Sequence, residues 1–307
     1  MPWFPPEDSR LSAPIPTFPT RRPNTPTQST STLGRMPLAP THAVPMEAEV
    51  VARADFLHVM LRAALGANYR VPVTNPAYIL DIGCGSGRWV REMASEFPGA
   101  RVVGLDITPP VESSPGVSGV YATASGRERS YAYVQHNALE PLTFAPASFD
   151  LTHMRQMMRV LPVAAWPKVV GEMARVTAPG GWIELVEDDF VRNGGLALDT
   201  IQRWAFQTML PQGLDPRRSS QLADLLHTLA LNDIQTHTVE LPVGPHGGRF
   251  GELMGNDYLA RVEGLRARVI GARVATSDEF TQAQNALRQE MERMEYILPV
   301  YVVYGRR

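Results

Sequence analysis

Residues 78–89 read Tyr-Ile-Leu-Asp-Ile-Gly-Cys-Gly-Ser-Gly-Arg-Trp, and this stretch decides the fold. Its apolar start is typical of a buried strand, and the alternate glycines Gly83, Gly85 and Gly87 follow. Apolar residues then recur at helical spacing as far as Pro98. A strand, a glycine turn and a helix in this order predict a crevice for a nucleotide-like ligand, because glycines let the backbone approach a ligand closely.

Strands and helices keep alternating beyond this turn. Apolar runs predict four further strands, at 101–106, 131–135, 149–154 and 182–187. Helical patterns precede the first strand, over about 46–66, and the last of these strands, over about 164–176. The segment 108–130 is rich in Pro, Gly and Ser and predicts a loop. This alternation predicts a parallel, doubly wound α/β sheet.

Composition limits the class of protein. The chain has 307 residues, 44% of them apolar, which suffices for a sizeable core. A net charge of -2 gives no electrostatic reason to expect nucleic acid or an acidic membrane surface as a partner. We find neither a secretory signal nor an apolar run of the roughly 20 residues that cross a bilayer. The single cysteine, Cys84, cannot form an internal disulfide. We therefore expect a soluble cytoplasmic protein.

Residues 1–45 differ in composition from the rest of the chain. They are rich in proline and contain a Thr/Ser-rich run, so they lack the apolar surface that would offset the entropy of ordering them. We predict a disordered segment over 1–45 and a folded domain over 46–307. A partner-binding or targeting arm is the alternative for the first segment.

Acidic residues follow the predicted strands at their carboxyl ends, where ligands bind in such sheets. Asp81 lies near the end of the first strand. Asp106 ends the second, where a carboxylate can accept hydrogen bonds from ribose hydroxyls. Glu187, Asp188 and Asp189 end the fifth. We consider Glu187 and His153 as candidates for a general base.

Four different motifs follow one another along the chain. They are Asp81-Ile-Gly-Cys-Gly-Ser-Gly87, the acid that ends the second strand, Phe149-Asp150 at the start of the fourth strand, and Ala178-Pro-Gly-Gly before the fifth. Together they resemble the class I S-adenosylmethionine-dependent methyltransferases, and the resemblance covers about 46–187. It implies a Rossmann-like, mostly parallel, seven-stranded sheet with an antiparallel final strand. The last two strands then correspond to 234–241 and 298–304, with helical lid insertions at about 190–215 and 243–296.

The resemblance also implies S-adenosylmethionine as cofactor. The residues expected to contact it are Asp81, Gly83, Cys84, Gly85, Gly87, Asp106, Ile107, Asn137, Ala138 and His153. The glycine turn and Asp81 would hold the methionine end, Asp106 the ribose, and Asn137 and Ala138 the adenine. His153 would lie beside the methionine and open toward the substrate. Asn137 stands where the family often has an acid.

The resemblance leaves the methyl acceptor open. Aromatic and methionine residues in the predicted lid segments favour a small, largely apolar acceptor, methylated on O, N or C, with a role in specialised metabolism. Candidate contacts are His58, Tyr69, Trp204, Met254 and Tyr258, although each also fits a packing role. We expect no metal, because no Cys or His cluster has zinc spacing. The sequence leaves open whether the protein forms a homodimer.

Two alternatives compete with this interpretation. A nicotinamide-dependent oxidoreductase would use the same strand, turn and helix, but its glycines follow the spacing G-x-G-x-x-G, whereas this chain has G-x-G-x-G. A carboxylate such as Asp81 would also repel the pyrophosphate of that cofactor. The second alternative is a non-catalytic methyltransferase-like binding protein, since a fold does not guarantee chemistry.

Overall fold

The computed structural model describes residues 48–108, 110, 118–122 and 128–307. The segment 1–45, for which the sequence predicts disorder, lies outside the described residues.

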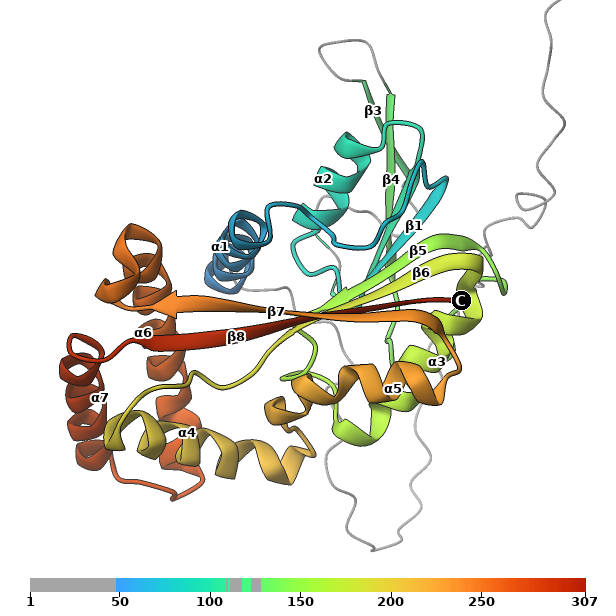
Figure 1. Ribbon diagram of the computed structural model, residues 1–307. Helices are drawn as coiled ribbons and strands as arrows, with labels where there is room; N and C mark the ends of the chain where they lie inside the picture. Colours follow the sequence, from blue (N-terminus) through green and yellow to red (C-terminus); the bar gives the residue numbers. More distant parts are fainter. Residues whose placement is uncertain (1–47, 109, 111–117, 123–127) are drawn as a thin grey trace, which may run out of the picture. The chain divides into compact units, whose positions relative to one another are not determined.

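One sheet, with the strand order β3-β4-β2-β1-β5-β6-β8-β7, forms the centre of the described domain (Figure 1). Its strands are β1 (Tyr78–Ile82), β2 (Arg101–Asp106), β3 (Ser118–Ala122), β4 (Glu128–Gln135), β5 (Phe149–Arg155), β6 (Thr177–Asp188), β7 (Asn232–Val243) and β8 (Tyr296–Arg306). Strands β4, β2, β1, β5 and β6 pair in parallel, and β8 runs antiparallel to β6 and β7. The predicted mostly parallel, doubly wound sheet with an antiparallel final strand is confirmed.

The sheet has one strand more than the sequence predicts. Strand β3 comes from the segment predicted as a loop and pairs antiparallel with β4. It reads Ser-Gly-Val-Tyr-Ala, which lacks a clear apolar alternation. Such a strand forms because the open edge of β4 offers unpaired backbone groups, which is information from the tertiary fold rather than from the local pattern.

Helices cover both faces of the sheet. They are α1 (Ala48–Leu65), α2 (Arg88–Glu96), α3 (Trp166–Val176), α4 (Leu196–Met209), α5 (Leu222–Thr228), α6 (Gly248–Gly271) and α7 (Ser277–Met291). Helices α1 and α2 share one buried core with the sheet, and α3 and α5 share the other (Figure 1). Helices α4, α6 and α7 pack on one another near the carboxyl end of β7. This helical cluster and α1 therefore lie near the carboxyl ends of the parallel strands.

Local sequence explains the central β1–α2 unit. β1 is buried on both faces, as parallel strands between two helical layers are. Gly87 then adopts a left-handed backbone conformation with φ 70° and begins α2. The helix buries Trp89, Val90 and Met93 at helical spacing. At the amino end of β1, the Asp150 carboxylate accepts hydrogen bonds from the backbone N–H groups of Ala77 (2.8 Å) and Tyr78 (3.0 Å), which ties β1 to β5.

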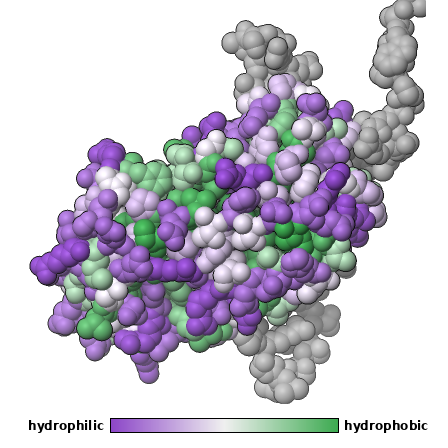
Figure 2. Space-filling view, viewed as in Figure 1, coloured by the Kyte–Doolittle hydropathy of each residue, from purple (hydrophilic) through white to green (hydrophobic). Residues whose placement is uncertain are grey.

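The surface mixes polar and apolar residues, with small apolar patches on the face shown in Figure 2. None of the described helices combines the length and the apolar content that crossing a membrane requires.

Helix α7 anchors the helical cluster through Phe280. Its side chain is 0% exposed, stacks on Trp204 of α4 at a centroid distance of 6.0 Å, and lies under the guanidinium of Arg266. The capping box of Thr276 and Glu279 fixes the start of the same helix. Phe280 therefore joins α7 to the preceding helix α6 and to the more distant helix α4.

We predict that Phe280→Ala lowers the free energy of unfolding by about 3–5 kcal/mol, because it removes a fully buried ring and leaves a cavity. Urea unfolding followed by circular dichroism measures this. Leu210→Ala, at a side chain that is 52% exposed, is the control and should change stability by less than about 0.5 kcal/mol. Equal effects of the two substitutions would contradict the anchoring role.

Candidate active site

The glycine turn after β1 has the geometry of a ligand-binding loop. Gly83, Gly85 and Gly87 all have positive φ, at 73°, 53° and 70°. The backbone N–H groups of Gly83 (2.7 Å) and Cys84 (3.1 Å) donate to the carbonyl of Leu105, which holds the turn against β2. A Cβ at Gly87 would collide with the Tyr133 hydroxyl, whereas a Cβ at Gly85 would meet no atom within 4 Å. The turn is thus packed at Gly87 and open at Gly85, where a ligand can approach the backbone.

Asp106 joins the end of β2 to this turn. Its Oδ2 accepts a hydrogen bond from Gly85 N–H at 2.9 Å, and its Oδ1 accepts one from Thr108 N–H at 2.8 Å. Burial raises the pKa of this carboxyl, while the backbone donors act against the rise. Ile107, the next residue, is 39% exposed. The predicted ribose acid therefore lies beside the open part of the glycine turn.

Asp81, His153 and Glu184 form a buried row across β1, β5 and β6. The three residues are register partners, so their side chains lie on the same face of the sheet. His153 Nδ1 and Asp81 Oδ1 are hydrogen-bonded at 2.8 Å, and His153 Nε2 lies 3.9 Å from Glu184 Oε2. Trp89 stacks on the imidazole at a centroid distance of 4.0 Å.

His153 is thus placed against Asp81 beneath Trp89, with 0% of its surface exposed. The sequence-based expectation was a side chain open toward the substrate. In the structure the imidazole orients the Asp81 carboxylate, and its role as a general base stays a prediction.

Glu187 supports the turn that follows β5. Its carboxylate accepts hydrogen bonds from the N–H groups of Met157 (2.7 Å) and Met158 (2.9 Å), and its side chain is buried. Burial raises the pKa of Glu187 to about 8, against the effect of the two donors. The Met157 side chain in turn packs over Gly83, where its sulfur would contact an added Cβ. Glu187 thereby braces the glycine turn from the side opposite Asp106.

The next two acids connect the sheet to α6 and to the chain after β6. Asp188 pairs with Arg159 at 2.7 Å and with Arg261 of α6 at 3.4 Å. Asp189 pairs with Arg192 at 3.1 Å. The three consecutive carboxylates at 187–189, of which Glu187 is a predicted general base, therefore have three separate sets of partners.

Of the remaining predicted cofactor contacts, Cys84 lies in the glycine turn, whereas Asn137 and Ala138 follow β4. Asn137 Oδ1 accepts a hydrogen bond from Leu139 N–H at 3.0 Å and closes its own turn after β4. Ala138 packs against the core on the α3 and α5 face. The Cys84 thiol is 8% exposed, and burial raises its pKa well above the usual value.

The predicted acceptor contacts divide between two regions. His58 on α1 is 2% exposed, and Tyr69 packs on Phe97 at a centroid distance of 5.6 Å. Trp204, Met254 and Tyr258 belong to α4 and α6. Met254 is 1% exposed, and burial raises the pKa of Tyr258 to about 12. Contacts of these five residues with an acceptor stay predictions.

Sequence reasoning missed several residues near the turn. Asp55 of α1 pairs with the Ser86 hydroxyl at 2.5 Å, and Arg155 of β5 contacts His58 at 2.6 Å. Arg155 carried a usable signal, because it is a basic residue at the carboxyl end of a predicted strand. Asp55 had no comparable signal, since its partner depends on how α1 packs.

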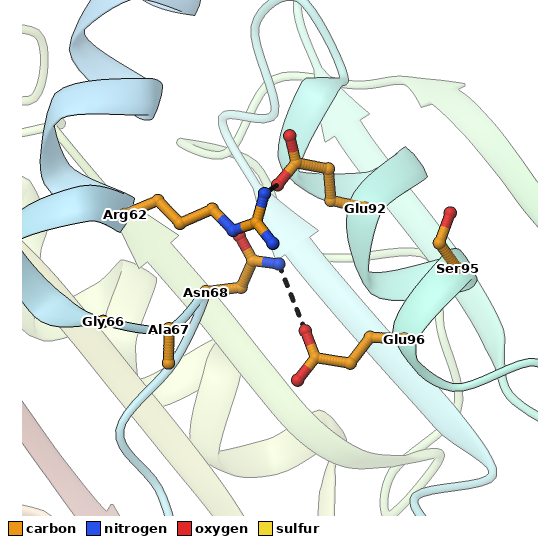
Figure 3. A pocket seen from close by; sticks show the side chains of 7 residues that line it. All are labelled: Arg62, Gly66, Ala67, Asn68, Glu92, Ser95 and Glu96. Carbon is orange, nitrogen blue, oxygen red and sulfur yellow. Dashed lines mark hydrogen bonds and ion pairs between the residues drawn. The ribbon is translucent and has the colours of Figure 1, made fainter.

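A hollow of ≈ 470 Å³ lies between α1 and the outer side of α2 (Figure 3). Arg62 points from α1 toward Glu92, with 3.1 Å between Nη1 and Oε2, and the Asn68 amide donates to Glu96 at 3.1 Å. These contacts join α1 and the chain after it to α2. The glycine turn is not among the residues that line the hollow.

We predict that Glu187 makes stability fall as pH rises. Its pKa of about 8 in the folded protein exceeds the usual 4.5, so the folded state binds the proton more tightly. The stabilisation is complete below about pH 4.5 and is lost as pH approaches 8, with a slope of about 1.4 kcal/mol per pH unit between them.

Urea unfolding from pH 5 to pH 8 at constant ionic strength measures this slope. Glu187→Gln should remove the decline, because an amide can still accept a backbone hydrogen bond but does not ionise. A decline of the same steepness in this variant would show that Glu187 is not its source.

Comparisons with known proteins agree with this geometry. Residues 79–181 match the family model described as a methyltransferase domain. The methyltransferase str3 of Strobilurus tenacellus is 31% identical over 184 residues, 57% of this chain and 60% of str3. The methyltransferase str2 of the same fungus is 30% identical over 210 residues, 63% of this chain and 68% of str2.

A third relative is the secondary metabolism regulator laeA of Monascus pilosus, 26% identical over 205 residues, 63% of this chain and 52% of laeA. The chain thus matches about half to two thirds of the length of these relatives. The motif order, the sheet and these matches place the chain in the family of class I S-adenosylmethionine-dependent methyltransferases.

Proposed function

We propose that this protein transfers the methyl group of S-adenosylmethionine to a small, largely apolar acceptor in specialised metabolism. The observation that carries the proposal is the open glycine turn at Gly85, with Asp106 hydrogen-bonded beside it and Asp81 in the strand before it. A Cβ at Gly85 would enter free space, which is what a turn that admits a ligand requires.

The donor set fits the chemistry of the cofactor. The Asp106 carboxylate can accept hydrogen bonds from ribose hydroxyls, and the exposed Ile107 beside it offers an apolar surface. The Asp81 carboxylate suits the ammonium group of the methionine end. His153, which stacks on Trp89, holds that carboxylate in place. The bound cofactor supplies a methyl group already activated by the positive charge of its sulfonium sulfur.

The protein's contribution to the reaction is then mainly positioning. Holding the acceptor atom in line with the methyl group converts a bimolecular reaction into a unimolecular one. Glu187 fixes the turn at Met157, and the ion pairs of Asp188 fix α6 over the end of β6. We infer that these carboxylates shape the site, since each is engaged by backbone N–H groups or by arginines.

Aromatic residues near the end of β6 suit an apolar acceptor. Phe190 follows the acidic stretch and packs edge-to-face on Phe206 of α4 at a centroid distance of 6.4 Å. The Arg159 guanidinium lies 5.6 Å from the centroid of the Phe190 ring. The similarity to laeA of Monascus pilosus, which is described as a secondary metabolism regulator, supports a role in specialised metabolism.

A protein acceptor is the second candidate. The laeA protein of Emericella nidulans, 25% identical over 214 residues, is described as a protein-methionine methyltransferase. A methionine side chain is itself small and apolar. Incubation with radiolabelled S-adenosylmethionine and a cell extract separates the two candidates, because the label would enter either the small-molecule fraction or a protein band.

We predict that Asp106→Ala weakens S-adenosylmethionine binding by about 10- to 100-fold, because it removes the expected ribose partner and frees Gly85 N–H. Isothermal titration calorimetry measures the change. Asp233→Ala, at an exposed carboxylate of β7, is the control and should bind as the wild type does.

Wild-type protein that binds no S-adenosylmethionine would refute the proposed function. Binding of NAD in its place would favour the oxidoreductase alternative. Binding of S-adenosylmethionine without methyl transfer to any small-molecule or protein fraction would favour the non-catalytic alternative.

A further inference from the structure

Arg155 brings a positive charge to the centre of the proposed cofactor site. It is the last residue of β5, whose Met154 is the register partner of Ile82. Arg155 therefore comes one step nearer the carboxyl edge, level with the start of the glycine turn. Side chains alternate along a strand, so Arg155 lies on the same face as His153 and Asp81.

The charges of several carboxylates act on this guanidinium, and none of the described residues forms an ion pair with it. Burial lowers the pKa of Arg155, and the charges of Asp81, Glu92, Glu184 and Asp55 act against that change. Among the described residues, no carboxylate oxygen lies within 4.0 Å of the guanidinium. A partly buried cation without a close anion is costly, and a bound anion would lower that cost.

His58 holds Arg155 from the opposite side. Nη2 of Arg155 donates to Nδ1 of His58 at 2.6 Å, which is the one hydrogen bond of this guanidinium within the described part of the chain. His58 Nε2 lies 3.0 Å from Glu92. Burial and the charge of Arg155 lower the pKa of His58 to about 4, so the imidazole is neutral and accepts at Nδ1. The other guanidinium donors remain available to a ligand.

Helix α1 positions His58. Asp55, His58 and Arg62 are spaced by three and four residues, so they share one face of the helix. Asp55 contacts Ser86 in the glycine turn, and Arg62 contacts Glu92 on α2 (Figure 3). The face of α1 that fixes His58 is therefore tied directly to the proposed cofactor site.

We propose that Arg155 binds the carboxylate of the cofactor's methionine moiety and that His58 is its positioning residue. This inference rests on the proposed function. The methionine moiety carries an ammonium and a carboxylate next to each other. Asp81 suits the first group, and a guanidinium fork matches the second through two parallel hydrogen bonds.

The decisive experiment compares two ligands that differ in this moiety. S-adenosylhomocysteine carries the amino-acid part, whereas 5′-methylthioadenosine lacks it but keeps the adenosine and the sulfur. Arg155→Gln should weaken binding of S-adenosylhomocysteine by about 10- to 100-fold and leave binding of 5′-methylthioadenosine within about twofold of wild type. Calorimetry on the full chain gives both affinities.

Arg101→Gln is the matched control. This arginine is exposed at the amino end of β2, on the opposite edge of the sheet. Its substitution should leave both affinities unchanged. The preserved affinity for 5′-methylthioadenosine also shows that Arg155→Gln is folded at the site.

Two substitutions of His58 test its positioning role. His58→Leu should lower the affinity for S-adenosylhomocysteine alone, and His58→Gln should restore part of it, because an amide can accept from Arg155 and donate to Glu92. Combined with Arg155→Gln, His58→Leu should cause no further loss. Additive losses would overturn the positioning role.

Two outcomes overturn the inference for Arg155. Equal losses for both ligands would give Arg155 a purely structural role. Unchanged affinity for S-adenosylhomocysteine would show that it does not bind the cofactor's carboxylate. Wild-type protein that binds neither ligand would instead refute the proposed function itself, so the two failures are distinguishable.

Discussion

The hydrogen bond from Gly85 N–H to the Asp106 carboxylate is the interaction on which the site depends. It joins the turn after β1 to the end of β2, next to the bonds that Gly83 and Cys84 donate to Leu105. Residues with positive φ keep a unique conformation only where their surroundings hold them. Here β2 holds the middle of the turn, Met157 packs over Gly83, and Asp55 contacts Ser86. Separate elements therefore hold the turn on either side of Gly85.

A second constraint comes from buried charge. Asp81, His153 and Glu184 are nearly or fully buried in one register row, where an unpaired charge would be costly. The hydrogen bond between His153 and Asp81 lowers this cost. Glu184 also accepts a hydrogen bond from Arg70 N–H at 2.6 Å. His153 Nε2 and Glu184 Oε2 still lack hydrogen-bond partners. Such a row fixes the Asp81 carboxylate and leaves a negative potential that suits a cationic ligand.

The central parallel strands were predictable from the sequence because strands such as β1 and β5 are buried on both faces and alternate with helices. The sequence also placed Asp81 and Asp106 together, since the carboxyl ends of adjacent parallel strands meet at one edge. Strand β3 was not predictable, because its pairing depends on the free edge of β4.

The surroundings of His153 and Glu187 were not predictable either. The side that a strand residue faces depends on register, and a single sequence does not fix register. Helix α1 was predicted, but its contacts with Ser86 and Arg155 require the packed structure.

Polar contacts connect α1, α6 and the end of β6. Helix α1 contacts the glycine turn, the proposed S-adenosylmethionine site, through Asp55. On the side of β6, α6 contacts Asp188 through Arg261, which also pairs with Asp257 at 2.9 Å. Arg53 of α1 lies 3.7 Å from the same Asp257. Although the partly exposed Arg53 pair contributes little energy by itself, the other members are largely buried. A continuous series of polar contacts thus runs from the end of β6 through α6 and α1 to the glycine turn. A displacement of α1 would therefore disturb the contact of Asp55 with the glycine turn, and a displacement of α6 would disturb the pair of Arg261 with Asp188.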